Sequence, residues 1–143
     1  MNFKLVDQTD NTHNIPDPGS RLTILVFYPK DNTPGCSVEI GEFAQLAEEF
    51  AKIGAVVFGV SGPGNKKKFA EKTGCNFPLL TDEGFRLSEH FGVYKDKKFM
   101  GKSYKGIERT TIVLNNQGEV VRRFDNVKPA GHAQEVLNHL LRL

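Results

Sequence analysis

Apolar residues in the first third of the chain follow two different patterns, and each pattern predicts a different element. Residues 22–28 (LTILVFY) are apolar without alternation, which is typical of a strand covered on both faces in a mostly parallel sheet. From Thr33 onward, apolar residues recur at spacings of three and four. This spacing predicts a helix that runs to about Lys52 and ends at Gly54. A helix is therefore expected directly after a central strand.

The rest of the chain continues to alternate between strand and helix patterns. The polar segment 93–106 is expected to be a long loop, and a hairpin is expected around the turn NNQG, where Gly118 accepts a positive φ. The remaining predicted elements are strands at 3–6, 55–60, 77–81, 108–114 and 119–125, and helices at 65–74, 83–91 and 129–141. This order predicts an α/β fold with a central mixed sheet, helices on both faces and an N-terminal hairpin, in one domain spanning residues 1–143.

Composition adds few constraints on function. The 143 residues are 38% hydrophobic and 25% charged, and Lys plus Arg number 19 against 17 Asp plus Glu. This near balance gives no argument for nucleic acid or membrane partners, and the basic run 66–68 is expected to be a solvated helix face. The sequence has neither the ~20 consecutive apolar residues of a membrane span nor a signal-peptide pattern. We expect a cytoplasmic protein, or an organelle stromal one if a targeting segment has been removed.

Cys36 lies in polar turn chemistry rather than in an apolar pattern. Thr33 has the side chain of an N-cap, Pro34 suits the first helical position, and Cys36 then occupies the third. The first helical turn presents unpaired N–H groups and the positive end of the helix dipole, which stabilise a thiolate. Open sheets also perform chemistry at the carboxyl ends of their strands. These residues alone leave two readings open: a nucleophile, or a cysteine tolerated at a helix start.

Three residues in this stretch form the P-x-x-x-T-x-x-C pattern of the peroxiredoxins: Pro29, Thr33 and Cys36, within FYPKDNTPGCSVE. The segments NFPLLTDEGFRLSEHFGV, FMGKSYKGIERTT and GEVVRRFDNVKPAGHAQEVL resemble the bacterioferritin-comigratory or plant Q type of that family. The resemblance runs in register from about residue 22 to the C-terminus. Several motifs in order are far more specific than any one of them.

The resemblance implies a thioredoxin-like fold and reduction of hydrogen peroxide or alkyl hydroperoxides by a cysteine thiolate. Cys36 matches the attacking cysteine, and Thr33 matches the threonine whose hydroxyl bonds the thiolate and the peroxide. Pro29 matches the residue that shields the pocket from water, and Arg109 in GIERTT matches the arginine beside the thiolate. Preorganised donors of this kind stabilise the charge that develops on the departing oxygen. The alternative for Arg109 is a plain surface charge at the start of a strand.

Neighbouring residues are expected to support this set. Glu39 either pairs with Arg109 and orients its guanidinium, or is an ordinary first-turn acid. Gly35, within TPGC, is a second supporting position. Tyr28 either lines the pocket or belongs to the core.

The second cysteine, Cys75, matches neither place where the family carries a resolving thiol. Those places hold Gly41 and Ala70 here. Cys75 is therefore interpreted as a small buried hydrophobe, with resolution of Cys36 after local unwinding as the alternative. We predict a one-cysteine mechanism, in which thioredoxin, glutaredoxin or glutathione reduces the sulfenic acid of Cys36.

Other classes of function are less consistent with the sequence. A thioredoxin-class oxidoreductase needs a C-x-x-C pair, and TPGC has Thr33 where the first cysteine would stand. A non-enzymatic redox sensor would use Cys36 but would not need the rest of the set. The four histidines show no ligand spacing with the cysteines, so no metal and no cofactor are predicted. We expect a monomer, because members of this subfamily often are.

Overall fold

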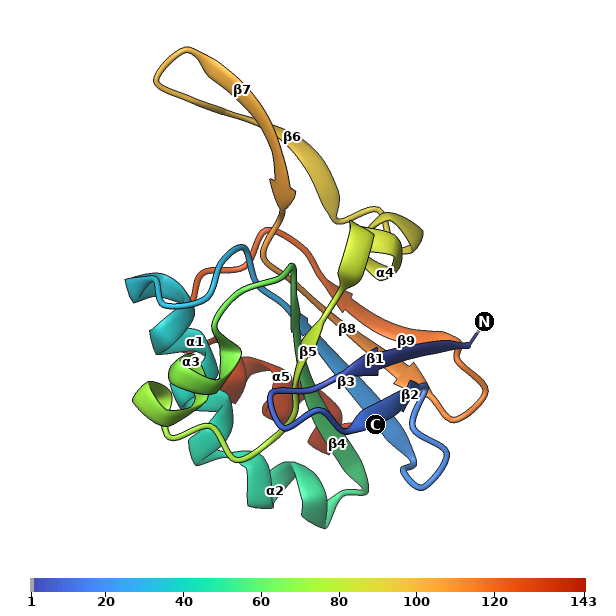
Figure 1. Ribbon diagram of the computed structural model, residues 1–143. Coiled ribbons are helices and arrows are strands. Elements are labelled where there is room, and N and C mark those ends of the chain that lie inside the picture. Colours follow the sequence, from blue (N-terminus) through green and yellow to red (C-terminus); the bar gives the residue numbers. More distant parts are fainter. Residues whose placement is uncertain (1) are drawn as a thin grey trace.

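The computed structural model describes residues 2–143, and its centre is a seven-stranded mixed sheet in the order β2-β1-β5-β4-β3-β8-β9 (Figure 1). β3 (Leu22–Phe27) pairs in parallel with β4 (Ala55–Ser61) and antiparallel with β8 (Thr110–Asn115). The outer strands are β5 (Leu79–Thr81), β9 (Val120–Phe124) and an N-terminal hairpin of β1 (Phe3–Val6) and β2 (Thr12–Ile15). The predicted mixed sheet and N-terminal hairpin are confirmed.

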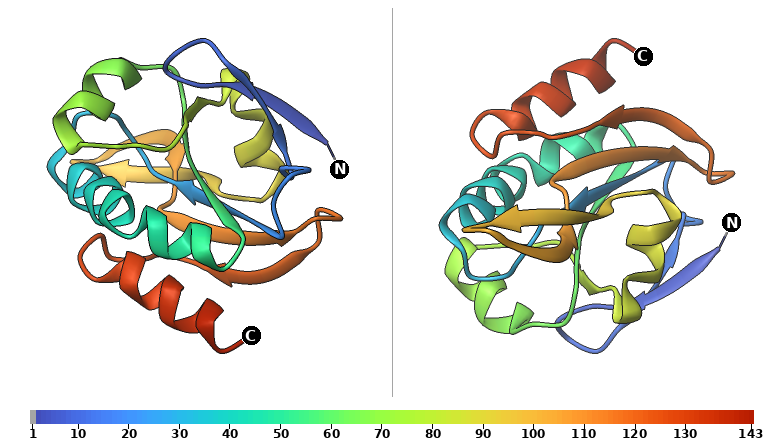
Figure 2. Two further views of the ribbon diagram at one scale, coloured as in Figure 1. Left: turned by 90° about the horizontal axis from the view of Figure 1, so that it is seen from below. Right: turned by 90° about the horizontal axis from the view of Figure 1, so that it is seen from above.

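Helices cover both faces of this sheet, as predicted (Figure 2). One face packs against α1 (Pro34–Gln45), α2 (Ala47–Lys52), α3 (Lys66–Thr73) and α5 (His132–Leu141). The other face packs against α4 (Arg86–His90), which follows a short 3-10 turn, η1 (Glu83–Phe85). Within residues 2–143 no helix has the length and apolar character needed to cross a membrane.

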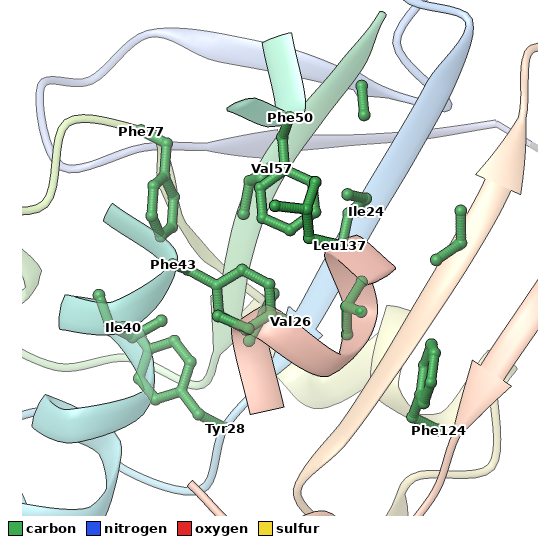
Figure 3. Packing of buried hydrophobic residues seen from close by; sticks show 14 of the residues in the cluster. Ile24, Val26, Tyr28, Ile40, Phe43, Phe50, Val57, Phe77, Phe124 and Leu137 are labelled. Carbon is green, nitrogen blue, oxygen red and sulfur yellow. The ribbon is translucent and has the colours of Figure 1, made fainter. Parts of the chain in front are cut away.

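The strand β3 is apolar throughout because both of its faces are buried. Ile24 and Val26 point toward Phe43 and Phe50, whose rings stack with centroids 5.8 Å apart (Figure 3). The alternate residues of β3 pack on the α4 side. Full burial of such a side chain contributes roughly 1.5–3 kcal/mol. The continuous apolar run therefore belongs to a central strand.

The helix predicted from Thr33 to about Lys52 is divided at Leu46 into α1 and α2. Leu46 has φ −101° and ψ 4°, and its N–H bonds the carbonyls of Glu42 and Phe43. Leu46 keeps the apolar spacing, so the pattern contains no signal for this break. Gly54, with φ 78°, follows the end of α2 as predicted.

Two further helices begin later than the pattern indicates. The helix predicted at 83–91 starts as the 3-10 turn η1, and α4 begins at Arg86. Asp82 accepts bonds from the N–H groups of Leu87 and Ser88, at 3.0 and 2.8 Å, in the first turn of α4. The last helix begins at His132 rather than at residue 129, because the left-handed conformation of Gly131 (φ 80°) is incompatible with a helix through this position.

The segment 93–106 is wrongly predicted as a loop. It forms a two-stranded hairpin of β6 (Tyr94–Phe99) and β7 (Lys102–Ile107) that projects from the body of the protein (Figure 1). The turn residues Met100 and Gly101 both have positive φ, as in the type I′ turns of tight hairpins. Both faces of the hairpin are largely exposed, so its strands lack the apolar alternation from which strands are predicted.

The sheet topology brings several segments together at one edge. β3, β4 and β5 are parallel, so their carboxyl ends share this edge, and the helices α1 and α3 begin there. β8 is antiparallel to β3 and begins at the same edge, with Thr110 paired to Phe27. The base of the β6–β7 hairpin directly precedes β8. This edge is where chemistry is expected in an open sheet.

Candidate active site

Cys36 lies at the start of α1, in the position predicted from the sequence. Thr33 is the N-cap residue with extended backbone angles, φ −108° and ψ 153°, and Pro34 begins the helix. Cys36 is 1% exposed. The Thr33 side chain makes no capping bond: its hydroxyl donates to the carbonyl of Lys30 at 2.9 Å. The hydroxyl proton of Thr33 is therefore directed away from the Cys36 sulfur, contrary to the expected bond.

Arg109 reaches Cys36 across 73 residues of sequence. Because Thr110 pairs with Phe27, Arg109 lies beside the end of β3, from which the chain leads into α1. Its Nη2 donates to Cys36 Sγ at 3.5 Å. A Cβ atom at Gly35 would lie only 3.2 Å from the same Nη2, so a glycine at this position leaves the space that Arg109 occupies. The alternative of a plain surface charge at position 109 is wrong.

Glu39 lies one turn further along α1 and holds the other arm of the guanidinium. Its Oε1 accepts from Arg109 Nη1 at 2.8 Å, and the side chain is fully buried. Burial raises the pKa of Glu39 to about 7, although Arg109 lowers it. Burial by itself would lower the pKa of Arg109, but the charges of Glu39 and Cys36 raise it. The predicted pairing of Glu39 with Arg109 is confirmed.

A second buried ion pair lies on the other side of the loop before Cys36, and the sequence did not reveal it. Lys66 is 3% exposed, and its Nζ donates to Asp31 Oδ2 at 2.9 Å and to the Gly62 carbonyl at 2.5 Å. The Tyr28 hydroxyl donates to Asp31 Oδ1 at 2.5 Å. The expected solvated helix face is therefore wrong for Lys66. The three side chains connect the loop after β3 to the start of α3.

This network also decides between the two readings of Tyr28. The side chain is fully buried, so Tyr28 belongs to the core rather than to an open pocket. Burial, together with the charge of Asp31, raises the pKa of its hydroxyl well above the usual value. Burial lowers the pKa of Lys66, against the opposing effect of Asp31. Removing one partner of such a buried pair costs about 3–5 kcal/mol, so the pair fixes the loop firmly.

Pro29 lies in an open pocket beside Arg109. The same pocket is lined by Lys97 from the β6–β7 hairpin and by Val127, whose N–H donates to the Arg109 carbonyl. Lys97 Nζ donates to the carbonyl of Ile107 at 2.6 Å. Burial lowers the pKa of Lys97, and the neighbouring Arg109 lowers it further. Pro29 and Arg109 are thus brought together as predicted, with a second cation that was not predicted.

Cys75 has different surroundings. It follows Gly74, the αL residue that ends α3, and its Sγ donates to the Phe77 carbonyl at 3.2 Å. It packs against the apolar core, and burial raises the pKa of its thiol to about 11. Both cysteines are free thiols.

Comparison with known proteins identifies the family. The model of the AhpC/TSA family matches residues 1–123. Peroxiredoxin Bcp of Escherichia coli (strain K12) is 39% identical over 140 residues, which cover 96% of this chain and 90% of that protein. Peroxiredoxin Bcp of Bacillus subtilis is 40% identical over 131 residues, covering 90% and 83%.

Solved structures give the same result. The bacterioferritin comigratory protein of Xanthomonas campestris, known for alkyl peroxide reduction, superimposes with a TM-score of 0.90 at 37% identity, covering 98% of this chain and 90% of that one. Peroxidoxin BcpB of Mycobacterium tuberculosis gives 0.86 at 31%, covering 100% and 94%. These matches confirm the thioredoxin-like fold expected from the sequence. With a family model over most of its length and relatives of this similarity, the chain belongs to the AhpC/TSA family and is a peroxiredoxin.

Proposed function

We propose that Cys36 is the peroxidatic residue of this thiol-dependent peroxidase and that an external thiol completes each cycle. The observation that carries the proposal is the guanidinium of Arg109, which donates to Cys36 Sγ at 3.5 Å while the sulfur lies in the first turn of α1. A cation and a helix N-terminus both favour the thiolate, which is the nucleophilic form of cysteine.

In the first step the thiolate of Cys36 attacks one oxygen of the hydroperoxide. An S–O bond forms and the O–O bond breaks. Cys36 is oxidised by two electrons to a sulfenic acid, and the departing oxygen takes a proton from solvent to leave as water or an alcohol. Both hydrogen peroxide and alkyl hydroperoxides fit this chemistry, and the activity known for the Xanthomonas relative supports the alkyl class.

Arg109 has the central supporting role in this step. Negative charge passes from sulfur to the departing oxygen, and a preorganised guanidinium stabilises that charge without reorganisation. Glu39 holds Nη1 at 2.8 Å, which leaves Nη2 directed at the sulfur. Thr33 becomes a donor to the peroxide only if its hydroxyl turns away from the Lys30 carbonyl.

The second step is reduction by a thiol from outside the chain. A thiol attacks the sulfenic sulfur, releases water and forms a mixed disulfide, and a second thiol then frees Cys36. Cys75 is a poor candidate for the first of these thiols because burial raises its pKa to about 11. The sites where relatives carry a resolving thiol hold Gly41 and Ala70.

Stopped-flow oxidation of the reduced protein by hydrogen peroxide tests the proposal, with Cys36→Ser and Cys75→Ser measured beside wild type. We expect Cys36→Ser to lose the fast reaction and Cys75→Ser to keep it. Mass spectrometry after one equivalent of peroxide should find a sulfenic acid on Cys36. An intramolecular Cys36–Cys75 disulfide in good yield would contradict external resolution, and a wild-type rate equal to that of a free thiol would remove the peroxidatic role.

A further inference from the structure

The β6–β7 hairpin has two different faces, which follow from its register. Lys97 lies opposite Tyr104 and Phe99 opposite Lys102, so these side chains share one face with Lys95. We name this set, Lys95, Lys97, Phe99, Lys102 and Tyr104, the front face. Phe99 and Tyr104 are 67% and 50% exposed, although large aromatic side chains normally bury most of their surface.

Positive charge is concentrated on this hairpin. Residues 94–107 contain five of the 19 basic residues of the chain and a single acid, Asp96. The formal net charge of the segment is thus +4, whereas that of the whole chain is +2. The front face carries three of the five lysines, and Asp96 alternates with Lys95 and Lys97 and lies opposite Lys105.

The base of the front face reaches the pocket of Pro29 and Arg109. Lys95 and Lys97, at this base, line the pocket, and Asp96 and Glu108 line it too. Lys95 pairs with Glu108 at 2.7 Å, so within residues 2–143 the unpaired lysine on the outer half of this face is Lys102. The opposite face is tied to the body of the protein: the ring of Tyr94 stacks on Phe85 with centroids 4.2 Å apart. The front face is therefore held in place beside the pocket of Arg109 while its outer half stays exposed.

A hairpin of two strands is only marginally stable by itself in water. Its six-residue strands extend about 20 Å at 3.3 Å per residue, which is much longer than a small thiol needs for contact. Aromatic side chains are enriched in protein interfaces relative to the rest of the surface. The lysines around them complement the charge of an acidic partner. The charged and aromatic residues also run along the side of the hairpin, not only at its tip.

We propose that the front face is the docking surface for the protein that reduces Cys36: a small dithiol protein whose reactive cysteine lies in an apolar patch surrounded by acidic residues. This proposal rests on the proposed function. The partner thiolate attacks the Cys36 sulfenic acid, forming an S–S bond and releasing water. Its second thiol then breaks that bond, so that Cys36 is reduced by two electrons and the partner leaves as a disulfide.

Turnover with an acidic thioredoxin and thioredoxin reductase tests the docking surface, and dithiothreitol serves as the small uncharged reductant. Lys102→Glu changes the front face, and Lys98→Glu, on the opposite face at the same end of the hairpin, is the matched control with the same change in charge. We expect Lys102→Glu to lower kcat/KM for thioredoxin roughly tenfold at low salt, mainly through KM, and Lys98→Glu to have little effect. Tyr104→Ser should weaken docking through lost aromatic contact.

The outcomes separate this proposal from the proposed function. Equal loss in Lys102→Glu and Lys98→Glu, or an equal loss of turnover with dithiothreitol, would overturn the docking surface. Front-face-dependent sedimentation with phosphatidylserine vesicles, or front-face-dependent dimers in ultracentrifugation, would overturn it in favour of another occupant. If wild type fails to turn over peroxide both with thioredoxin and with dithiothreitol, the proposed function itself fails.

Discussion

Cys36 and Cys75 lie at opposite kinds of helix end. Cys36 is in the first turn of α1, where backbone N–H groups are unpaired, whereas Cys75 follows the last turn of α3, where carbonyls are unpaired. The hydrogen-bond partners of the two sulfur atoms differ in the same way. Arg109 donates to the Cys36 sulfur, while the Cys75 sulfur donates to the carbonyl of Phe77. Donors around a sulfur favour the thiolate, and an acceptor keeps the proton on the thiol.

Burial alone does not distinguish the two cysteines. Cys36 is the more buried, at 1% exposed, yet it lies beside a cation and a helix start. Cys75 has apolar neighbours, and burial raises its pKa to about 11. Burial disfavours a thiolate and a neighbouring cation favours it, and the structure places such a cation beside Cys36. The distinction can be tested at each sulfur separately.

The largest expected effect is the pH dependence of Cys75. In the Cys36→Ser variant, alkylation of Cys75 by iodoacetamide should rise about tenfold per pH unit from pH 7 to 10, because the thiolate is a small fraction throughout this range. The sign follows from the raised pKa: the proton is still bound where an ordinary thiol has already lost it. The rate is measured by mass spectrometry on the intact protein.

The same variant unfolded in urea is the control. Its thiol should approach its maximum rate near pH 9, as an ordinary cysteine does. Circular dichroism at each pH confirms that the folded sample stays folded. A plateau near pH 9 in the folded protein would mean that the surroundings of Cys75 do not suppress its thiolate.

Removal of the donor at Cys36 has the next largest effect. Arg109→Met should slow the oxidation of Cys36 by hydrogen peroxide by roughly 10²–10³, as for other preorganised donors of this kind. Arg109→Lys keeps the positive charge but loses the planar guanidinium, which bonds Glu39 and Cys36 at the same time, so an intermediate rate is expected. The half-buried Arg123, which pairs with Asp125 and donates to the carbonyl of Phe91, gives the matched control Arg123→Met. A wild-type rate in Arg109→Met would show that the helix start alone activates Cys36.

Much of the fold could be predicted because the buried strands have a strong pattern. The continuous apolar run of β3 and the glycines that end α2 and α3 gave nearly correct boundaries. The β6–β7 hairpin was missed because both of its faces are exposed and its turn has a methionine at positive φ. Alternation of apolar and polar residues predicts a strand only when one face of the strand is buried, and most residues of this hairpin are exposed on both faces.

The candidate site was predictable where chemistry and motif agree, at Pro29, Cys36, Glu39 and Arg109. The ion pair of Asp31 and Lys66 was not, since its members are 35 residues apart and Lys66 stands in a run of three lysines. Only the meeting of two loops at one sheet edge distinguishes Lys66 from Lys67 and Lys68. The orientation of the Thr33 hydroxyl was likewise a matter of local geometry.

The smallest expected effect concerns Glu39, the acid that holds Arg109 beside Cys36. Its pKa is raised from the ordinary 4.5 to about 7 by burial, so the folded protein binds one more proton than the unfolded chain between these values. The contribution of Glu39 to stability is therefore fully present below pH 4.5 and declines as pH rises through 7, by up to about 3 kcal/mol. Glu39→Gln should remove this decline. Urea denaturation of wild type and Glu39→Gln at pH 5 and pH 8 measures the difference in their free energies of unfolding. If this difference favours wild type more at pH 8 than at pH 5, Arg109 outweighs burial in this pair.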